Sequence, residues 1–129
     1  MENYSDQIKN FLDFLEMSRK SNTAAGVQEI DMDNRTQDIL HNIELYENNQ
    51  YDYIVRGIAL KDIRQKRREA KNTKEVTKPI VDWMRENTEA IKSLEKLLQA
   101  TKKIEKRAAG RQYQNRTDTV AGLPGEVDI

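Results

Sequence analysis

The stretch KDIRQKRREAKNTK, Lys61–Lys74, decides how the rest of the chain is interpreted. It holds seven basic residues against two acidic ones and contains neither Pro nor Gly. The early apolar positions of a helix are supplied by Ile54, Ile58 and Ile63. We therefore predict one long helix, from about residue 52 to 86, with this basic run at its middle.

Two features mark the end of this helix and the start of the next. Pro79 has no backbone N–H and its ring clashes with the preceding turn, so we predict a kink or break there. Asn87 is expected to cap a last helix, 88–108, whose apolar stripe is close to a heptad seam. Gly110 is expected to end it.

The N-terminal third is predicted to form short helices. Residues 5–20 carry an apolar stripe at helical spacing. The segment SNTAAG, 21–26, breaks that stripe and is typical of a loop, and 27–32 is expected to be a short extended segment. A second helix, 36–46, is then predicted, with Asn34 near its start as a cap.

The C-terminal end is predicted to be non-helical. Residues 111–117, RQYQNRT, indicate a short strand or extended arm, and 118–129 contains two Gly and one Pro and is expected to be a flexible tail. The predicted fold is thus mainly α, a long helical hairpin with short N-terminal helices and one or two short β-strands. Residues 1–117 are expected to form a single helical ligand-binding domain.

Composition favours an oligomer. Hydrophobic residues make up 36% and charged residues 34% of the chain, which gives a compact monomer a thin core. Helical hairpins of this kind recover stability by association. Residues 1–50 carry ten acids and four bases, whereas 51–129 carry twelve acids and eighteen bases. This asymmetry suits either self-association or an anionic partner.

Composition also indicates the cellular compartment in which the protein is expected. The chain has no cysteine, so disulfides and thiolate metal sites are excluded and a reducing cytoplasm is compatible. It shows no signal-like or membrane-spanning apolar run, so we expect no membrane partner.

The basic run is the first candidate site. At 3.6 residues per turn, the basic residues of the run fall along one side of the helix: Arg64, Arg67, Arg68, Lys71 and Lys74. Such a stripe is suited to phosphates, whether of a nucleic acid or of a small anion. The alternative is a solvated face balanced by Glu69 and by an acidic neighbouring element. No helix-turn-helix or zinc module accompanies the run, and nucleic acid is therefore the less favoured partner.

The tripeptide Asn-Arg-Thr, which occurs at 34–36 and at 115–117, is the second candidate. If Asn34 begins a helix, free backbone N–H groups there attract an anion, and Arg35 adds a planar fork for a phosphate. Arg116 and Thr117 are expected to close over the same ligand. The alternative is that Asn34 is only a cap and that Arg116 belongs to a tail.

Catalysis is not indicated. His41, the only histidine, has Asp38 three residues before it, but no nucleophile completes a catalytic set. No metal-ligand cluster or Gly-rich phosphate loop is present, and no cofactor or metal is expected. Trp83 beside Pro79 favours a core or subunit interface over a cofactor site.

A family resemblance covers about residues 34–117. The segment DNRTQDILHNIEL, the helix ending RQKRREAK, a Pro-x-x-x-Trp turn, the helix LLQATKKIEKR and the terminal QYQNRT resemble small phage proteins of the Thoeris anti-defence sponge family. Those proteins sequester a cyclic ADP-ribose signal before it activates the host effector.

The resemblance implies a homo-oligomer, a dimer or hexamer, with ligand pockets between subunits. It gives Arg35 and the pair Arg116 and Thr117 the role of phosphate contacts, and it makes Gln99 a polar contact. The family also stacks an aromatic residue on the adenine, and the nearest aromatic residue here is Trp83. Arg64 matches an arginine used by some members at a second site, for cyclic oligonucleotides.

The sequence thus predicts a non-enzymatic phage protein of the infected bacterial cytoplasm that binds and sequesters a cyclic nucleotide signal without degrading it. The predicted ligand contacts are Asn34, Arg35, Trp83, Gln99, Arg116 and Thr117, with a second anion site at Arg64, Arg67 and Arg68. Two alternatives stay open: an inhibitor that binds a host nuclease, and an accessory nucleic-acid-binding protein of phage replication.

Overall fold

The computed structural model describes residues 3–114 and 126–128. Over these residues it contains three helices and two short strands: α1 (Tyr4–Leu45), α2 (Gln50–Glu86), α3 (Thr88–Ala109), β1 (Gln112–Gln114) and β2 (Glu126–Asp128). The chain divides into two compact units, one of Asp13–Thr88 and one of Met1–Leu12 with Glu89–Ile129. The prediction of a mainly helical fold is confirmed.

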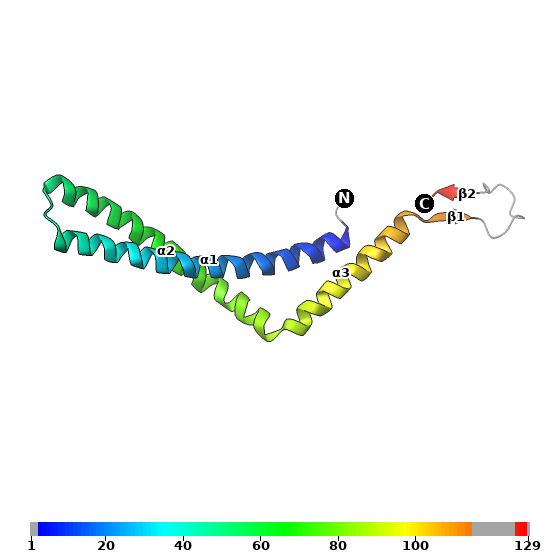
Figure 1. Cartoon of the computed structure of the whole chain (residues 1–129). Coiled ribbons are helices and arrows are strands. Elements are labelled where there is room, and N and C mark those ends of the chain that lie inside the picture. The colour runs from blue at the N-terminus through cyan, green and yellow to red at the C-terminus, as the bar shows by residue number, and fades with distance from the viewer. Residues whose placement is uncertain (1–2, 115–125, 129) are drawn as a thin grey trace, which may run out of the picture. The chain divides into compact units, whose positions relative to one another are not determined.

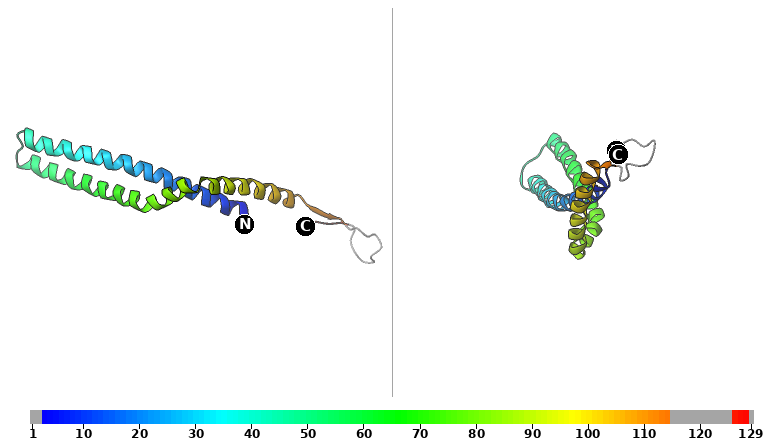
Figure 2. Two further views of the ribbon diagram at one scale, coloured as in Figure 1. Left: turned by 90° about the horizontal axis from the view of Figure 1, so that it is seen from below. Right: turned by 90° about the vertical axis from the view of Figure 1, so that its right-hand side faces the viewer.

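The first unit is an antiparallel helical hairpin. Residues 13–45 of α1 run alongside α2 (Figures 1 and 2). A short connection ends at Asn49, whose side-chain oxygen accepts a hydrogen bond from the Asp52 N–H at 2.8 Å. The Asp52 carboxylate in turn accepts from the Asn49 N–H at 3.1 Å. This reciprocal capping box fixes the start of α2. The antiparallel run of α1 and α2 agrees with the predicted long helical hairpin.

A heptad seam joins the two helices. Buried and half-buried residues recur along α1 at alternating intervals of three and four, which is the spacing of a coiled-coil contact. The seam residues of α1 are Leu15, Ser18, Asn22, Ala25, Glu29, Met32, Thr36, Ile39 and Ile43. Nearly half of them are polar, so the seam does not stand out as an apolar stripe in the sequence.

The continuity of α1 corrects the predicted N-terminal organisation. The predicted loop at 21–26, the extended segment at 27–32 and the separate helix at 36–46 are all part of one helix. Gly26 costs the helix only about 1 kcal/mol relative to alanine. The adjacent Ala24 and Ala25 are strong helix formers, and Ala25 is buried in the seam with α2. Tertiary packing therefore outweighs the local loop signal.

Buried hydroxyl groups in the seam are satisfied within α1 itself. Ser18 donates to the Phe14 carbonyl at 2.8 Å, and Thr36 donates to the Met32 carbonyl at 2.8 Å. Both hydroxyls are buried, yet neither lacks a hydrogen-bond acceptor. Because each hydroxyl donates to a carbonyl four residues earlier in α1, Ser18 and Thr36 fit into the seam without a hydrogen-bond acceptor from α2.

Polar contacts between the helices set the register of the hairpin. The Asn22 amide donates to the Lys74 carbonyl at 3.2 Å and to the Thr77 hydroxyl at 3.0 Å. Nearer the turn, the Arg56 guanidinium donates to the Asn42 amide oxygen. Because these bonds need specific side chains to face each other, they favour one alignment of the seam over a slipped one.

Helix α2 continues through Pro79 and ends at Glu86. Of the kink or break predicted there, the break is therefore wrong and the kink stays a prediction. A proline in a helix interior removes one backbone hydrogen bond, but the neighbouring turns hold the segment. Lys78 donates to Asp82 at 2.7 Å across one turn of the same region. Asn87 then terminates α2, with its side chain donating to the Trp83 carbonyl at 2.8 Å. The predicted ends of α2 and α3 agree with the structure to within two residues.

The second unit contains the start of α1, all of α3 and the strand pair. The Glu105 carboxylate of α3 accepts hydrogen bonds from the Ser5 N–H at 2.9 Å and the Ser5 hydroxyl at 2.6 Å. A carboxylate at the first turn of α1 suits the positive end of the helix dipole. Strand β1 pairs antiparallel with β2, with Tyr113 opposite Val127. The predicted tail, 118–129, lies mostly outside the described residues.

Few apolar side chains are buried. The buried hydrophobic residues among those described are Leu15, Ala25, Met32, Ala70 and Leu98. By contrast, large hydrophobic side chains such as Tyr51, Ile58 and Val76 are about two-thirds exposed or more (72%, 67% and 72%). In the described part of the chain, no helix has an apolar stretch long enough to cross a membrane.

Candidate functional site

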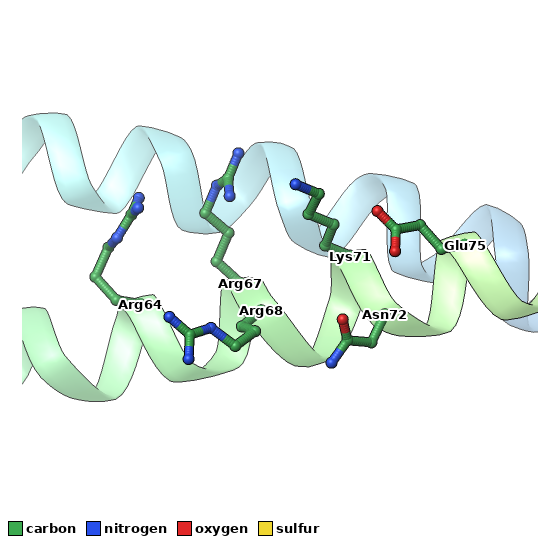
Figure 3. A pocket seen from close by; sticks show the side chains of 6 residues that line it. All are labelled: Arg64, Arg67, Arg68, Lys71, Asn72 and Glu75. Carbon is green, nitrogen blue, oxygen red and sulfur yellow. The ribbon is translucent and has the colours of Figure 1, made fainter.

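A hollow of the hairpin lies on α2, in the middle of the basic run. It has a volume of about 370 Å³, and its walls are formed by Arg64, Arg67, Arg68, Lys71, Asn72 and Glu75 (Figure 3). All six come from one helix, at intervals of three or four residues that keep them on one flank. The rise of 1.5 Å per residue spreads the set over about 16 Å of helix.

Arg67 is the inner wall of this hollow and belongs to the scaffold. Its guanidinium lies 2.5 Å from the Asp33 carboxylate and 3.6 Å from that of Glu29, both on α1. The Arg67 side chain is only 26% exposed. Lys74, two turns further along the seam, lies 3.9 Å from Glu29. The expected acidic neighbour thus exists, and it neutralises Arg67 and Lys74.

Arg64, Arg68 and Lys71 have no such neighbour. Among the described residues, no carboxylate oxygen lies within 4.0 Å of any of these three cations. Arg64 extends from α2 toward α1, and Arg68 lies over α2 itself (Figure 3). The hollow is therefore lined by three exposed cations whose charge is not balanced by a nearby ion pair.

Glu75 and Asn72 complete the hollow at its C-terminal end. Glu75 contributes the one carboxylate among the lining residues, so cations outnumber acids four to one. Guanidinium groups present planar pairs of donors that match a phosphate or carboxylate, and the Lys71 ammonium adds a point charge. This set of groups is suited to binding an anion by charge-assisted hydrogen bonds.

The first Asn-Arg-Thr tripeptide lies within α1 and not at a helix start. Asn34 is therefore in the helix interior, where the backbone N–H groups already donate within the helix. The predicted anion site at a helix N-terminus is wrong, because no helix begins at Asn34. The Arg35 guanidinium donates to Asp31 at 3.1 Å on the solvent side. Arg35 also borders a shallow hollow of about 700 Å³ that includes Met32 and Lys66.

The remaining predicted contacts lie elsewhere in the chain or outside the described residues. Trp83 lies on α2 with 40% of its surface exposed, about four turns beyond Arg68. Gln99 is exposed on α3, in the other unit. Arg116 and Thr117 lie outside the described residues, so the clamp assigned to them stays a prediction.

Metal ligands do not gather in the described part of the chain. Over residues 3–114 and 126–128, no group of three or more His, Cys, Asp or Glu side chains is placed to hold a metal ion. The prediction that no metal is bound stays a prediction for the whole chain.

Four residues in or beside the hollow are not among the predicted site residues. An extended segment at 27–32 does not predict that Glu29 and Asp33 are partners of Arg67. An unbroken heptad count from Leu15 would have placed Glu29 on the seam of α1. Asn72 and Glu75 follow the basic residues at helical spacing, and continuing that spacing by one turn would have identified them.

Comparison with models of protein families, with curated proteins and with solved structures gave no match. The resemblance to the anti-defence sponge family therefore stays a prediction from the quoted segments.

Proposed function

We propose that the protein binds a phosphate-bearing ligand on α2, through Arg64, Arg68 and Lys71, and holds it without chemical change. One observation carries this proposal: three neighbouring cations line one hollow with no carboxylate within 4.0 Å in the described part of the chain. Like charges held this close repel one another, so an anion that bridges them is stabilised.

The size of the hollow favours a small ligand. Its volume of about 370 Å³ lies within the range of small-molecule sites, roughly 300–1,000 Å³. Together with the resemblance described above, this supports a cyclic nucleotide of the cyclic ADP-ribose type as the ligand. Sequestration then operates by mass action, since a protein present in excess over its dissociation constant lowers the free signal.

Binding measurements on arginine variants test the proposed site. We expect Arg68→Ala to weaken the binding of cyclic ADP-ribose by roughly tenfold or more, because a charged hydrogen bond contributes about 1.5–3 kcal/mol. Arg85→Ala is a matched control, since Arg85 is 75% exposed on the same helix but lies outside the hollow. Titration calorimetry on both variants gives the comparison, and equal affinities would place the ligand elsewhere.

Recovery of the ligand tests sequestration separately. The protein is loaded with the ligand, freed of unbound molecules and then heat-denatured. We expect the released ligand to have its original mass and retention time. Release of a chemically altered ligand would show that the protein is an enzyme.

The linear arrangement of the cations along α2 also suits a second candidate, a single-stranded nucleic acid. Such a strand would contact phosphates successively, and its affinity would fall steeply with salt, in proportion to the number of phosphates neutralised. A short oligonucleotide titrated at several salt concentrations separates the candidates. Binding at least as tight as that of the cyclic nucleotide would favour the nucleic-acid function.

A further inference from the structure

Helix α2 carries a second apolar stripe, on the side opposite the hairpin seam. Its members are exposed despite their size: Tyr51 72%, Ile54 54%, Ile58 67%, Val76 72% and Trp83 40%. At 100° per residue, each of these side chains points within about 40° of their common mean direction around the helix axis. This mean direction is roughly 180° from that of Arg67 in the seam. We call this set, together with the half-buried Ile80, the outer stripe.

The outer stripe is symmetric about residue 67. Tyr51 and Trp83 lie 16 positions from residue 67 on either side, Ile54 and Ile80 lie 13 positions away, and Ile58 and Val76 lie 9 positions away. An apolar pattern with this symmetry is complementary to a second copy of itself in the antiparallel direction. Each apolar cluster would then cover the opposite cluster of the partner, over about 48 Å of helix.

The polar middle of the outer stripe has the same symmetry. Asp62 and Asn72 lie 5 positions from residue 67, and Gln65 and Glu69 lie 2 positions away. An antiparallel partner would place each carboxylate opposite an amide that can donate a hydrogen bond to it. Asp62 also pairs with Lys66 at 3.0 Å within the helix, which leaves other lone pairs for the partner. A parallel partner would instead place identical carboxylates opposite each other.

We infer that α2 forms an antiparallel homodimer through the outer stripe, with the two-fold axis close to Arg67. This symmetry keeps the same flank of both helices on the same side of the dimer. Because the cation hollow lies on the flank beside the outer stripe, Arg64, Arg68 and Lys71 of both copies would line one continuous groove. The three cations lie within four positions of residue 67, so the groove is centred on the axis.

A composite groove, formed by two copies, would enclose the ligand better than the hollow on one helix. One copy supplies only one wall, whereas the second copy supplies an equivalent wall with its own three cations. The anion would then bridge subunits and offset the repulsion between them. This last step rests on the proposed anion-binding function, but the dimer itself does not.

Engineered cysteines test the register, because the native chain has none. In the double variant Ile58→Cys/Val76→Cys, each new thiol faces its counterpart in the partner, and oxidation is expected to give a covalent dimer. Within one chain the two positions are about 27 Å apart, too far for a disulfide. Either single variant should remain uncrosslinked, since its two copies are equally far apart. Crosslinking of a single variant to the same extent would show another pairing, and a monomeric mass for the unmodified protein in solution would overturn the dimer.

A charge placed in the outer stripe tests the link between the dimer and the ligand. Ile58→Lys is expected to give monomers and to weaken cyclic ADP-ribose binding at least tenfold. Ile30→Lys is a matched control, because Ile30 is 64% exposed on α1, outside the outer stripe. A monomeric Ile58→Lys protein with unchanged affinity would disprove the composite groove but not the proposed function. If the unmodified dimer binds no phosphate-bearing ligand, the proposed function fails and the dimer stands.

Discussion

Three arginines within five residues of α2 differ in what surrounds them. Arg67 lies in the hairpin seam and contacts two carboxylates of α1, whereas Arg64 and Arg68 face the hollow without an acidic partner among the described residues. The sequence places all three on one side of a helix, and that prediction is sound. The sequence does not show that Arg67 stabilises the hairpin whereas Arg64 and Arg68 remain available to a ligand, because this difference depends on which side of α2 is covered by α1.

Replacement of Arg67 tests its role in the scaffold. We expect Arg67→Ala to lower the free energy of unfolding by about 1.5 kcal/mol, because Asp33 and Glu29 lose a charged hydrogen-bond partner in the seam. Arg64→Ala should change it by less than about 0.5 kcal/mol, as is usual for an exposed residue. Urea unfolding followed by circular dichroism gives both values. Equal losses would mean that Arg67 is as dispensable to the hairpin as Arg64.

Asp82 gives a residue-scale prediction about pH. The hydrogen bond from Lys78 holds the pKa of the Asp82 carboxyl below its usual value, and burial opposes this only in part. A lowered pKa in the folded state means that the contact stabilises the protein above the unfolded pKa and is lost as the pH falls through the folded pKa. We expect Lys78→Ala to raise the pKa of Asp82. An NMR titration of the carboxyl carbon would show it, and an unchanged midpoint would remove Lys78 as the cause.

At the scale of the element, α1 shows where local signals mislead. The segment 21–26 has the composition of a loop, yet it lies in the middle of a helix of 42 residues. Every third or fourth residue around it faces α2, and Asn22 makes two hydrogen bonds across the seam. Helix α2 and α3 were predictable because their apolar positions and capping residues agree with each other. The polar seam of α1 gives no comparable signal.

A substitution at Gly26 distinguishes helix from loop. A side chain added at Gly26 would meet no atom within 4 Å. In a continuous helix, Gly26→Ala is therefore expected to raise the free energy of unfolding by about 0.5–1 kcal/mol. Gly57→Ala, in the undisputed helix α2, is the matched control, because its added side chain also meets no atom within 4 Å. A loss of stability with Gly26→Ala alone would indicate a loop at this position.

At the scale of the whole molecule, the residues that the structure describes bury little apolar surface. Composition alone predicts this, since apolar and charged residues are nearly equal in number, and it favours an association partner. The identity of the associating face was not predictable without the hairpin. Only the position of the seam shows that Ile58 and Val76 point away from α1 and remain exposed. The clamp of Arg116 and Thr117 stays a prediction from the sequence.

The most direct test of the proposed function is to observe the arginine side chains while the ligand is added. In a ¹⁵N NMR titration with cyclic ADP-ribose, we expect the Nε–H signals of Arg64 and Arg68 to shift in proportion to occupancy. The signals of Arg67, held by Asp33, and of Arg85, outside the hollow, should move little. Saturable shifts at Arg64 and Arg68 would support the anion site on α2. Binding that leaves both signals in place would contradict it.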